Sequence, residues 1–126
     1  MNEVVVEPST TGKNGSEKRL NPRKDWVGKV VFEDERGEPL IYVYSENISI
    51  SGIYLASDIP MQLGSRAFLS FTLPSGAEIR TIGEVVRVKR EERSSSRQDP
   101  PRMGMGIRFL DLTLDQRQRV TSFCES

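Results

Sequence analysis

The sequence predicts a mainly β domain with a single helix at its C-terminal end. Two observations lead to this prediction. Short segments in which apolar and polar residues alternate follow one another through most of the chain, and glycine, proline, asparagine and serine separate them. From residue 113 onward the apolar residues instead take helical spacing. With 126 residues, the chain is long enough for one domain and too short for two good cores.

The first 17 residues form a region of a different kind. Residues 8–16 are almost all proline, serine, threonine, glycine or asparagine, which offer little surface to bury. We therefore expect residues 1–17 to be a disordered tail and residues 18–126 to be the folded domain. Residues 13–24 carry five basic side chains against one acidic side chain. Because Pro22 disfavours a helix before it, we expect this basic segment to be extended and to become ordered on an anionic ligand.

Six segments are predicted to be strands. The first alternates between two faces, and a turn at residues 35–39 separates it from the second, which is rich in β-branched and tyrosine residues. Tyr42 and Tyr44 recur at alternating positions, which favours a place in the wall of the core over exposed stacking platforms. The predicted strands are residues 26–33, 40–45, 53–56, 66–73, 78–89 and 103–109.

The last two predicted strands differ in regularity. Alternation in residues 78–89 fails at Val85 and Val86, which suggests a bulge at Gly83. We expect the charges of residues 87–102 to be solvated in a flexible hairpin loop. The last strand alternates cleanly, and the side chains expected to face the core are Met103, Met105, Ile107 and Phe109.

The C-terminal helix has a clear start signal. Thr113 is followed three residues later by Gln116, the spacing of a capping box. Val120, Phe123 and Cys124 form a narrow apolar stripe that could close one end of the sheet structure. We expect Cys124 to be a small buried hydrophobe there and not a reactive thiol.

The composition excludes several classes of function. The 18 basic and 18 acidic residues cancel, so no overall field attracts nucleic acid or an anionic membrane. The sequence has no histidine, the commonest general base and metal ligand, and a lone Cys124 can form neither an internal disulfide nor a zinc cluster. No apolar run is long enough to cross a bilayer. We expect a cytoplasmic binding protein without metal, cofactor or catalysis of its own.

One polar stretch stands between the second and third predicted strands. Asn47 offers an amide that donates and accepts, Ser49 offers a hydroxyl, and Gly52 can take positive φ and let a ligand approach the main chain. A tight β-turn uses the same residue types, so the stretch alone is consistent with both interpretations.

A second motif lies upstream, where Arg19 and Arg23 stand four residues apart with a proline between them. Together, Arg-x-x-x-Arg followed by Asn-x-Ser-x-x-Gly resembles the PilZ domain, a family that binds the bacterial second messenger cyclic di-GMP (c-di-GMP). The resemblance runs from about Lys18 to the C-terminus. It implies a six-stranded antiparallel β-barrel, with the arginine pair at its entry and Asn47, Ser49 and Gly52 on the surface beside it.

The resemblance also implies how the ligand would be held. Arginine fits because its planar fork makes paired hydrogen bonds to guanine or phosphate, which lysine does not. Arg19 and Arg23 would hold a guanine edge and a phosphate, and Asn47 and Ser49 the other guanine, with Gly52 making room. Many relatives have aspartate in place of Asn47, so affinity is expected to be modest. In the family, a basic residue in the position of Lys18 accompanies binding of a stacked ligand pair.

The function implied is a receptor that changes shape on binding c-di-GMP and signals to a protein partner, as in control of motility, biofilm or exopolysaccharide. Two alternatives stay open. One is a PilZ-like adaptor that acts through protein contacts without ligand. The other is a barrel for single-stranded nucleic acid, which would need a basic groove with exposed aromatic side chains.

Overall fold

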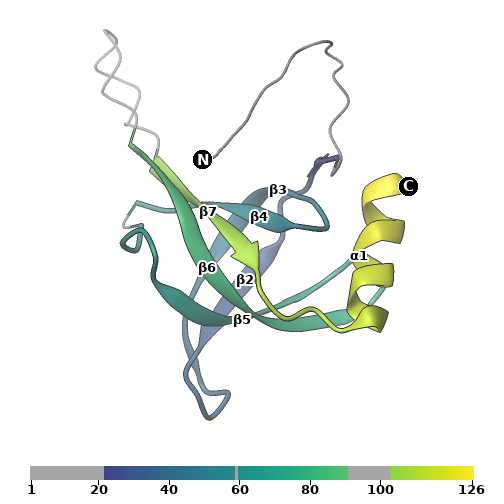
Figure 1. Cartoon of the computed structure of the whole chain (residues 1–126), viewed down its shortest axis with the longest axis horizontal. Coiled ribbons are helices and arrows are strands. Elements are labelled where there is room, and N and C mark those ends of the chain that lie inside the picture. Colours follow the sequence, from purple (N-terminus) through teal and green to yellow (C-terminus); the bar gives the residue numbers. More distant parts are fainter. Residues whose placement is uncertain (1–21, 59, 91–102) are drawn as a thin grey trace, which may run out of the picture.

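The computed structural model describes residues 22–58, 60–90 and 103–126. The predicted 1–17 tail, Lys18, Arg19 and most of the predicted 87–102 loop lie outside this described part of the chain. These described residues form seven strands and one helix (Figure 1). The elements are β1 (Lys24–Asp25), β2 (Lys29–Glu33), β3 (Pro39–Ile48), β4 (Gly52–Ala56), β5 (Arg66–Thr72), β6 (Glu78–Arg90), β7 (Met103–Phe109) and α1 (Leu114–Glu125).

Six of the strands close into an antiparallel barrel. The strand order is β1-β3-β2-β5-β6-β7-β4, and an additional pairing between β4 and β3 completes the ring. β1 is a two-residue addition that pairs with the last two residues of β3. The predicted mainly β architecture with six strands and a C-terminal helix is therefore confirmed.

The barrel interior is filled by apolar side chains from every long strand. Val30, Ile48, Ile53 and Leu55 have no exposed surface, and Leu69 and Met105 are 1% exposed. Burial of this kind contributes about 25 cal/mol per Å² of apolar surface removed from water, which makes the interior the main source of stability.

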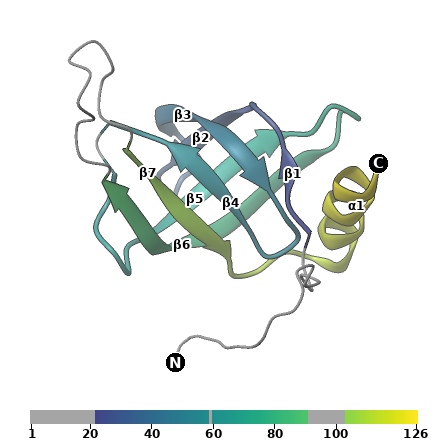
Figure 2. The ribbon, with the colours of Figure 1, turned by 90° about the horizontal axis from the view of Figure 1, so that it is seen from above.

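Helix α1 lies against one end of the barrel, beside β1 (Figures 1 and 2). The predicted capping box is present: the Thr113 side chain accepts from the backbone of Gln116, and the Gln116 side chain accepts from the backbone of Thr113. Val120 is fully buried, and the Phe123 ring meets the Trp26 ring edge-on with centroids 5.7 Å apart. The predicted apolar stripe therefore does pack against the barrel core.

The prediction that Tyr42 and Tyr44 belong to the wall of the core is wrong. Their side chains are 55% and 49% exposed, and their rings meet edge-on at 5.9 Å on the outer face of β3. The next residue of β3, Ser45, points inward instead and is 1% exposed. Its hydroxyl donates to the Trp26 carbonyl at 2.6 Å and accepts from the Gly28 amide at 2.9 Å.

These bonds explain a second departure. Residues 26–33 were predicted to be one strand, yet the backbone leaves the ladder between β1 and β2. Ser45 satisfies the backbone groups of Trp26 and Gly28 that the interrupted ladder would otherwise leave unpaired. Ser45 thus stabilises the irregular segment between β1 and β2 from inside the barrel, while Tyr42 and Tyr44 remain on the outer face.

The predicted bulge in β6 exists, but at another residue. The register between β6 and β7 shifts between Val85 and Arg87, so Val86 is the extra residue. Gly83 is in regular register, opposite Ala67 and Phe109. A Cβ at Gly83 would overlap the side chains of Ile107 and Leu69, so glycine is needed there for close packing.

Candidate functional site

The two sequence motifs meet in the structure at the end of β3. β1 pairs with β3 in a register that sets Lys24 opposite Ile48 and Asp25 opposite Asn47. Arg23 directly precedes β1, so this short pairing holds it beside the hairpin that joins β3 to β4. Its Nε donates to Asn47 Oδ1 at 2.6 Å, and its Nη1 donates to Ser49 Oγ at 3.4 Å.

The hairpin itself is tightly constrained. The Ser49 amide donates to the Gly52 carbonyl at 2.8 Å, and the Ser49 and Ser51 hydroxyls lie 2.9 Å apart. The Ser51 amide also donates to Ser49 Oγ at 3.2 Å. The same residues therefore form a tight turn and contact the arginine. Because Ser49 has no exposed surface, its hydroxyl acts on the turn and on Arg23.

The structure gives a reason for glycine at position 52 that the sequence did not reveal. Gly52 belongs to β4, and the described glycines with positive φ are Gly37, Gly64 and Gly76. A Cβ at Gly52 would overlap the carbonyl oxygen of Ile107 on β7. The missing side chain thus permits close approach of two strands, and the expected positive φ is not observed.

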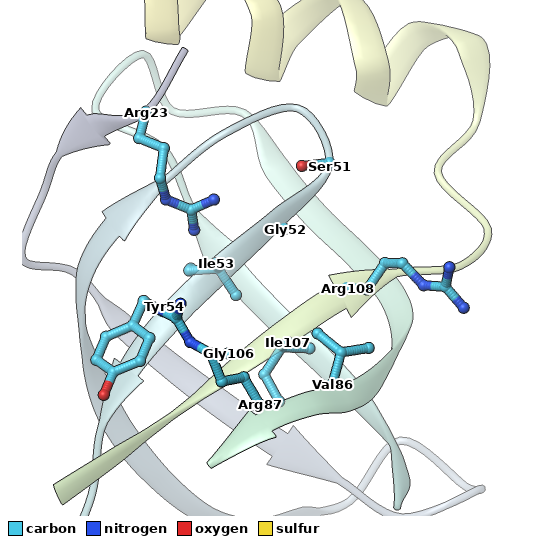
Figure 3. Close-up of a pocket in the computed structure, with 10 residues that line it drawn as sticks. All are labelled: Arg23, Ser51, Gly52, Ile53, Tyr54, Val86, Arg87, Gly106, Ile107 and Arg108. Atoms are coloured by element: carbon cyan, nitrogen blue, oxygen red, sulfur yellow. The ribbon is translucent and has the colours of Figure 1, made fainter. Parts of the chain in front are cut away.

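A pocket of about 470 Å³ opens on the barrel surface next to Arg23 (Figure 3). Its volume is in the range of small-molecule sites in proteins. Three arginines border it, from three parts of the chain: Arg23 before β1, Arg87 on β6 and Arg108 on β7. The remaining lining residues are Ser51, Gly52, Ile53, Tyr54, Val86, Gly106 and Ile107.

The three arginines face different surroundings. Arg23 bonds to the neutral groups of Asn47 and Ser49, and the guanidinium of Arg87 lies 5.6 Å from the centre of the Tyr54 ring. Arg108 instead pairs with the Glu84 carboxylate at 3.3 Å. The three arginines bring positive charge to one pocket, and the Glu84 carboxylate lies at the Arg108 side of it.

Arg87 was not predicted as a site residue, because it falls in the segment expected to be a loop of solvated charges, and the sequence patterns indicate no role for Tyr54 or Arg108. The signal that could have revealed Arg87 was the failed alternation at Val85 and Val86. A bulge there turns the following residue to the opposite face. Arg19 and Lys18 lie outside the described residues, so their predicted roles remain predictions.

The end of α1 contacts both motif segments. The Cys124 thiol lies 3.6 Å from the carbonyl oxygen of Ile48, the residue between Asn47 and Ser49. Lys24, next to Arg23, donates to the Ser126 carbonyl at 2.9 Å, and its Nζ lies 5.1 Å from the centre of the Phe123 ring. Burial raises the pKa of the Cys124 thiol, and the charge of Lys24 partly opposes this shift.

The described residues contain neither a cluster of metal-binding side chains nor a helix suited to span a membrane. No group of three or more cysteine, aspartate and glutamate side chains gathers in residues 22–58, 60–90 and 103–126 as a metal site would require. Over the same ranges, no helix has the length and apolar character needed to span a membrane.

Comparison with known proteins gives one family. The PilZ domain family model matches residues 17–126 of this chain. A comparison with curated proteins finds no match. Among solved structures, the chain is similar to the inhibitor of motility MotI/DgrA of Bacillus subtilis, with 24% identity and a TM-score of 0.69 over 86% of this chain and 50% of that one.

Two further structures have the same fold and contain c-di-GMP. They are the PilZ domain of YcgR from Escherichia coli, with 10% identity and a TM-score of 0.64 over 82% of this chain and 86% of that one, and the K. pneumonia MrkH complex, with 18% identity and a TM-score of 0.61 over 84% and 50%. The chain thus spans half the length of MotI and of MrkH.

Proposed function

We propose that this chain, which belongs to the PilZ domain family, is a bacterial c-di-GMP receptor that binds its ligand beside Arg23 on the outer face of the barrel. The observation that carries the proposal is the contact of Arg23 with Asn47 and Ser49. Residues more than 20 positions apart meet there at a pocket bordered by arginines. The structures of YcgR and MrkH with c-di-GMP support the choice of ligand.

Each motif residue then has a distinct task. Arg23, together with Arg19, holds a guanine edge and a phosphate with its planar fork of donors. Asn47 has a second lone pair on the oxygen that accepts from Arg23, and this lone pair can accept from a guanine. Ser49, which is enclosed, holds Arg23 in place, and Gly52 brings the neighbouring strand close to the pocket.

The output is a change of conformation passed to a protein partner, without catalysis, in the cytoplasm. Helix α1 is the element best placed to respond, because its last turn contacts Ile48 and Lys24, which adjoin the motif residues. The similarity to an inhibitor of motility makes motility one candidate output. Biofilm and exopolysaccharide control are others.

The exposed tyrosines bear on the nucleic-acid alternative. Tyr42 and Tyr44 face outward, and Lys29 Nζ lies 4.6 Å from the centre of the Tyr42 ring. Such aromatic side chains could stack on bases. The balanced charge of the chain still disfavours a polyanion. We therefore favour the messenger and include an oligonucleotide in the test.

Isothermal titration calorimetry tests the proposal with c-di-GMP, GMP and a short single-stranded oligonucleotide in parallel. We expect c-di-GMP to bind with roughly micromolar affinity, about 8 kcal/mol, and the other two far more weakly. If c-di-GMP gives no heat even at high concentration, the receptor proposal is wrong, and the alternative of an adaptor that acts through protein contacts remains. Tighter binding of the oligonucleotide would favour the nucleic-acid barrel.

A further inference from the structure

The bulge in β6 places Arg87 on the outer face of the barrel. Val85 is 2% exposed and points inward, so regular alternation would turn Arg87 inward as well. The extra residue Val86 resets the alternation, and both Val86 and Arg87 are exposed. Bulges often redirect side chains next to binding sites. A charged side chain is thereby brought to the pocket and kept out of the core.

The Tyr54 ring is held flat against the barrel beneath Arg87. A Cβ at Gly104 would overlap the Tyr54 phenol, and a Cβ at Gly106 would lie 3.9 Å from the ring. Because Gly104 and Gly106 of β7 have no side chains, the Tyr54 ring can pack directly against this strand, and Tyr54 is only 8% exposed. The Arg87 guanidinium lies at 5.6 Å from the ring centre, which restricts its freedom through a cation–π contact.

Strand register connects this pair to the proposed ligand site. Asn47 is opposite Tyr54, Tyr54 is opposite Gly106, and Gly106 is opposite Arg87. One row therefore crosses four strands from Asn47 to Arg87, with the Tyr54 ring and a side-chain-free position between them. Figure 3 shows the Arg87 side chain extending to the Tyr54 ring on the same side of the pocket as Arg23.

We infer that Arg87, supported by Tyr54, is a platform on which one guanine base of the ligand stacks. This inference rests on the proposed c-di-GMP function. A planar guanidinium stacks on an aromatic base and lines up donors with guanine O6 and N7, which a lysine ammonium cannot do. The surroundings favour a base over a phosphate, because Tyr54, Val86 and Gly106 provide flat apolar surface beside the guanidinium.

The test measures c-di-GMP affinity by calorimetry for the wild type and for Arg87→Ala, Arg87→Lys and Arg66→Ala. Arg66 is the matched control: it is an exposed barrel arginine on the adjacent strand β5, with a long 3.9 Å ion pair to Glu84, and it does not line the pocket. We expect Arg87→Ala to bind about tenfold more weakly, the range of losing one base-stacking contact. Arg66→Ala should stay within about twofold of the wild type.

The lysine variant separates stacking from simple charge attraction. If a base stacks on the guanidinium, Arg87→Lys should be nearly as weak as Arg87→Ala. Wild-type affinity in Arg87→Lys would instead assign the position to a phosphate and overturn the inference, as would wild-type affinity in Arg87→Ala. The melting temperature of each variant reports its folding. Absence of binding by the wild type would count against the proposed function itself, a result that no Arg87 variant can mimic.

Discussion

Two hollows on the barrel surface both contain arginine, but the groups around each arginine differ. At the pocket beside the β3–β4 hairpin, Arg23 donates to the neutral oxygens of Asn47 and Ser49. At a second hollow of about 350 Å³, Arg80 lies 3.3 Å from the carboxylate of Glu33 and 3.3 Å from that of Glu78. Glu33 also accepts a hydrogen bond from the Ser70 hydroxyl.

The difference lies in the kind of oxygen that contacts each arginine. Carboxylates compensate the charge of Arg80, so an anion would have to displace them. Asn47 and Ser49 offer Arg23 neutral amide and hydroxyl oxygens, which hold a guanidinium less strongly than a carboxylate does. The second hollow resembles the first in volume and residue type, yet its arginine serves the fold. Helix α1 contacts both regions, since Gln116 Nε2 donates to the Arg80 carbonyl at 2.9 Å and Cys124 lies against Ile48.

The largest expected effect tests the comparison directly. Arg23→Ala should weaken c-di-GMP binding by about 2 kcal/mol or more, because it leaves ligand acceptors unpaired. Its melting temperature should change little, because Arg23 is exposed. Arg23→Lys should not restore affinity, since lysine lacks the planar fork. Calorimetry and thermal unfolding measure the two quantities.

Arg80→Ala is the matched control for this prediction. It should leave c-di-GMP affinity unchanged and lower the melting temperature slightly, because the Glu33 side chain, 9% exposed, loses its cation. Equal loss of ligand affinity in Arg80→Ala and Arg23→Ala would show that the two hollows do not differ in the way inferred.

The next largest effect concerns the second hollow. Asp111 accepts from the Thr81 hydroxyl at 2.6 Å and from the Ile82 amide at 2.8 Å. Asp111→Ala should reduce the free energy of unfolding by about 1.5 kcal/mol, because Thr81 is 5% exposed and loses its acceptor. Urea unfolding measures the loss. Ligand affinity should be unaffected, and a parallel loss of binding would contradict the division between the hollows.

Much of the fold follows from the sequence because alternation and capping are local signals. The bounds of β7 and the capping box of α1 were both predicted correctly. The orientation of β3 was not, because both of its faces carry large apolar residues. What decides it is Ser45, whose hydroxyl bonds to the backbone of a segment 17 or more residues away. Alternation marks two faces but does not tell which one is inside.

The candidate site could be predicted only in part from the sequence. The sequence motifs predict Arg23, Asn47 and Ser49 as site residues, and in the structure these residues do lie together. Arg87 was missed because its orientation depends on which of two adjacent valines is the bulged residue. From the sequence alone, Val85 and Val86 are equally good candidates for the bulged residue. Only the pairing of β6 with β7 shows that it is Val86. The structural reason for glycine at position 52 was missed in the same way, because the carbonyl that excludes a side chain there belongs to a distant strand.

A smaller effect is expected when the two hollows are made more alike. Asn47→Asp places a carboxylate beside Arg23. We expect c-di-GMP to bind more tightly by about 1 kcal/mol, because one carboxylate oxygen can hold Arg23 while the other accepts from guanine N1–H and N2–H. Calorimetry measures the change. Weaker binding would mean that a carboxylate at position 47 competes with the ligand for the Arg23 guanidinium, as Glu33 would compete for Arg80.

The smallest effect uses Cys124 as a reporter at the ligand end of α1. Burial raises the pKa of this thiol, and the thiolate is the species that reacts, so alkylation at neutral pH should be slower than in the urea-unfolded chain. Because the thiol contacts Ile48 between Asn47 and Ser49, a ligand held by those residues should change the alkylation rate modestly. Mass spectrometry with and without c-di-GMP measures this change. At a c-di-GMP concentration that just saturates the wild type, Arg23→Ala should show a much smaller change in rate, whereas Asp111→Ala should keep the wild-type response. If saturating c-di-GMP leaves the alkylation rate of Cys124 unchanged in the wild type, ligand binding does not alter the end of α1.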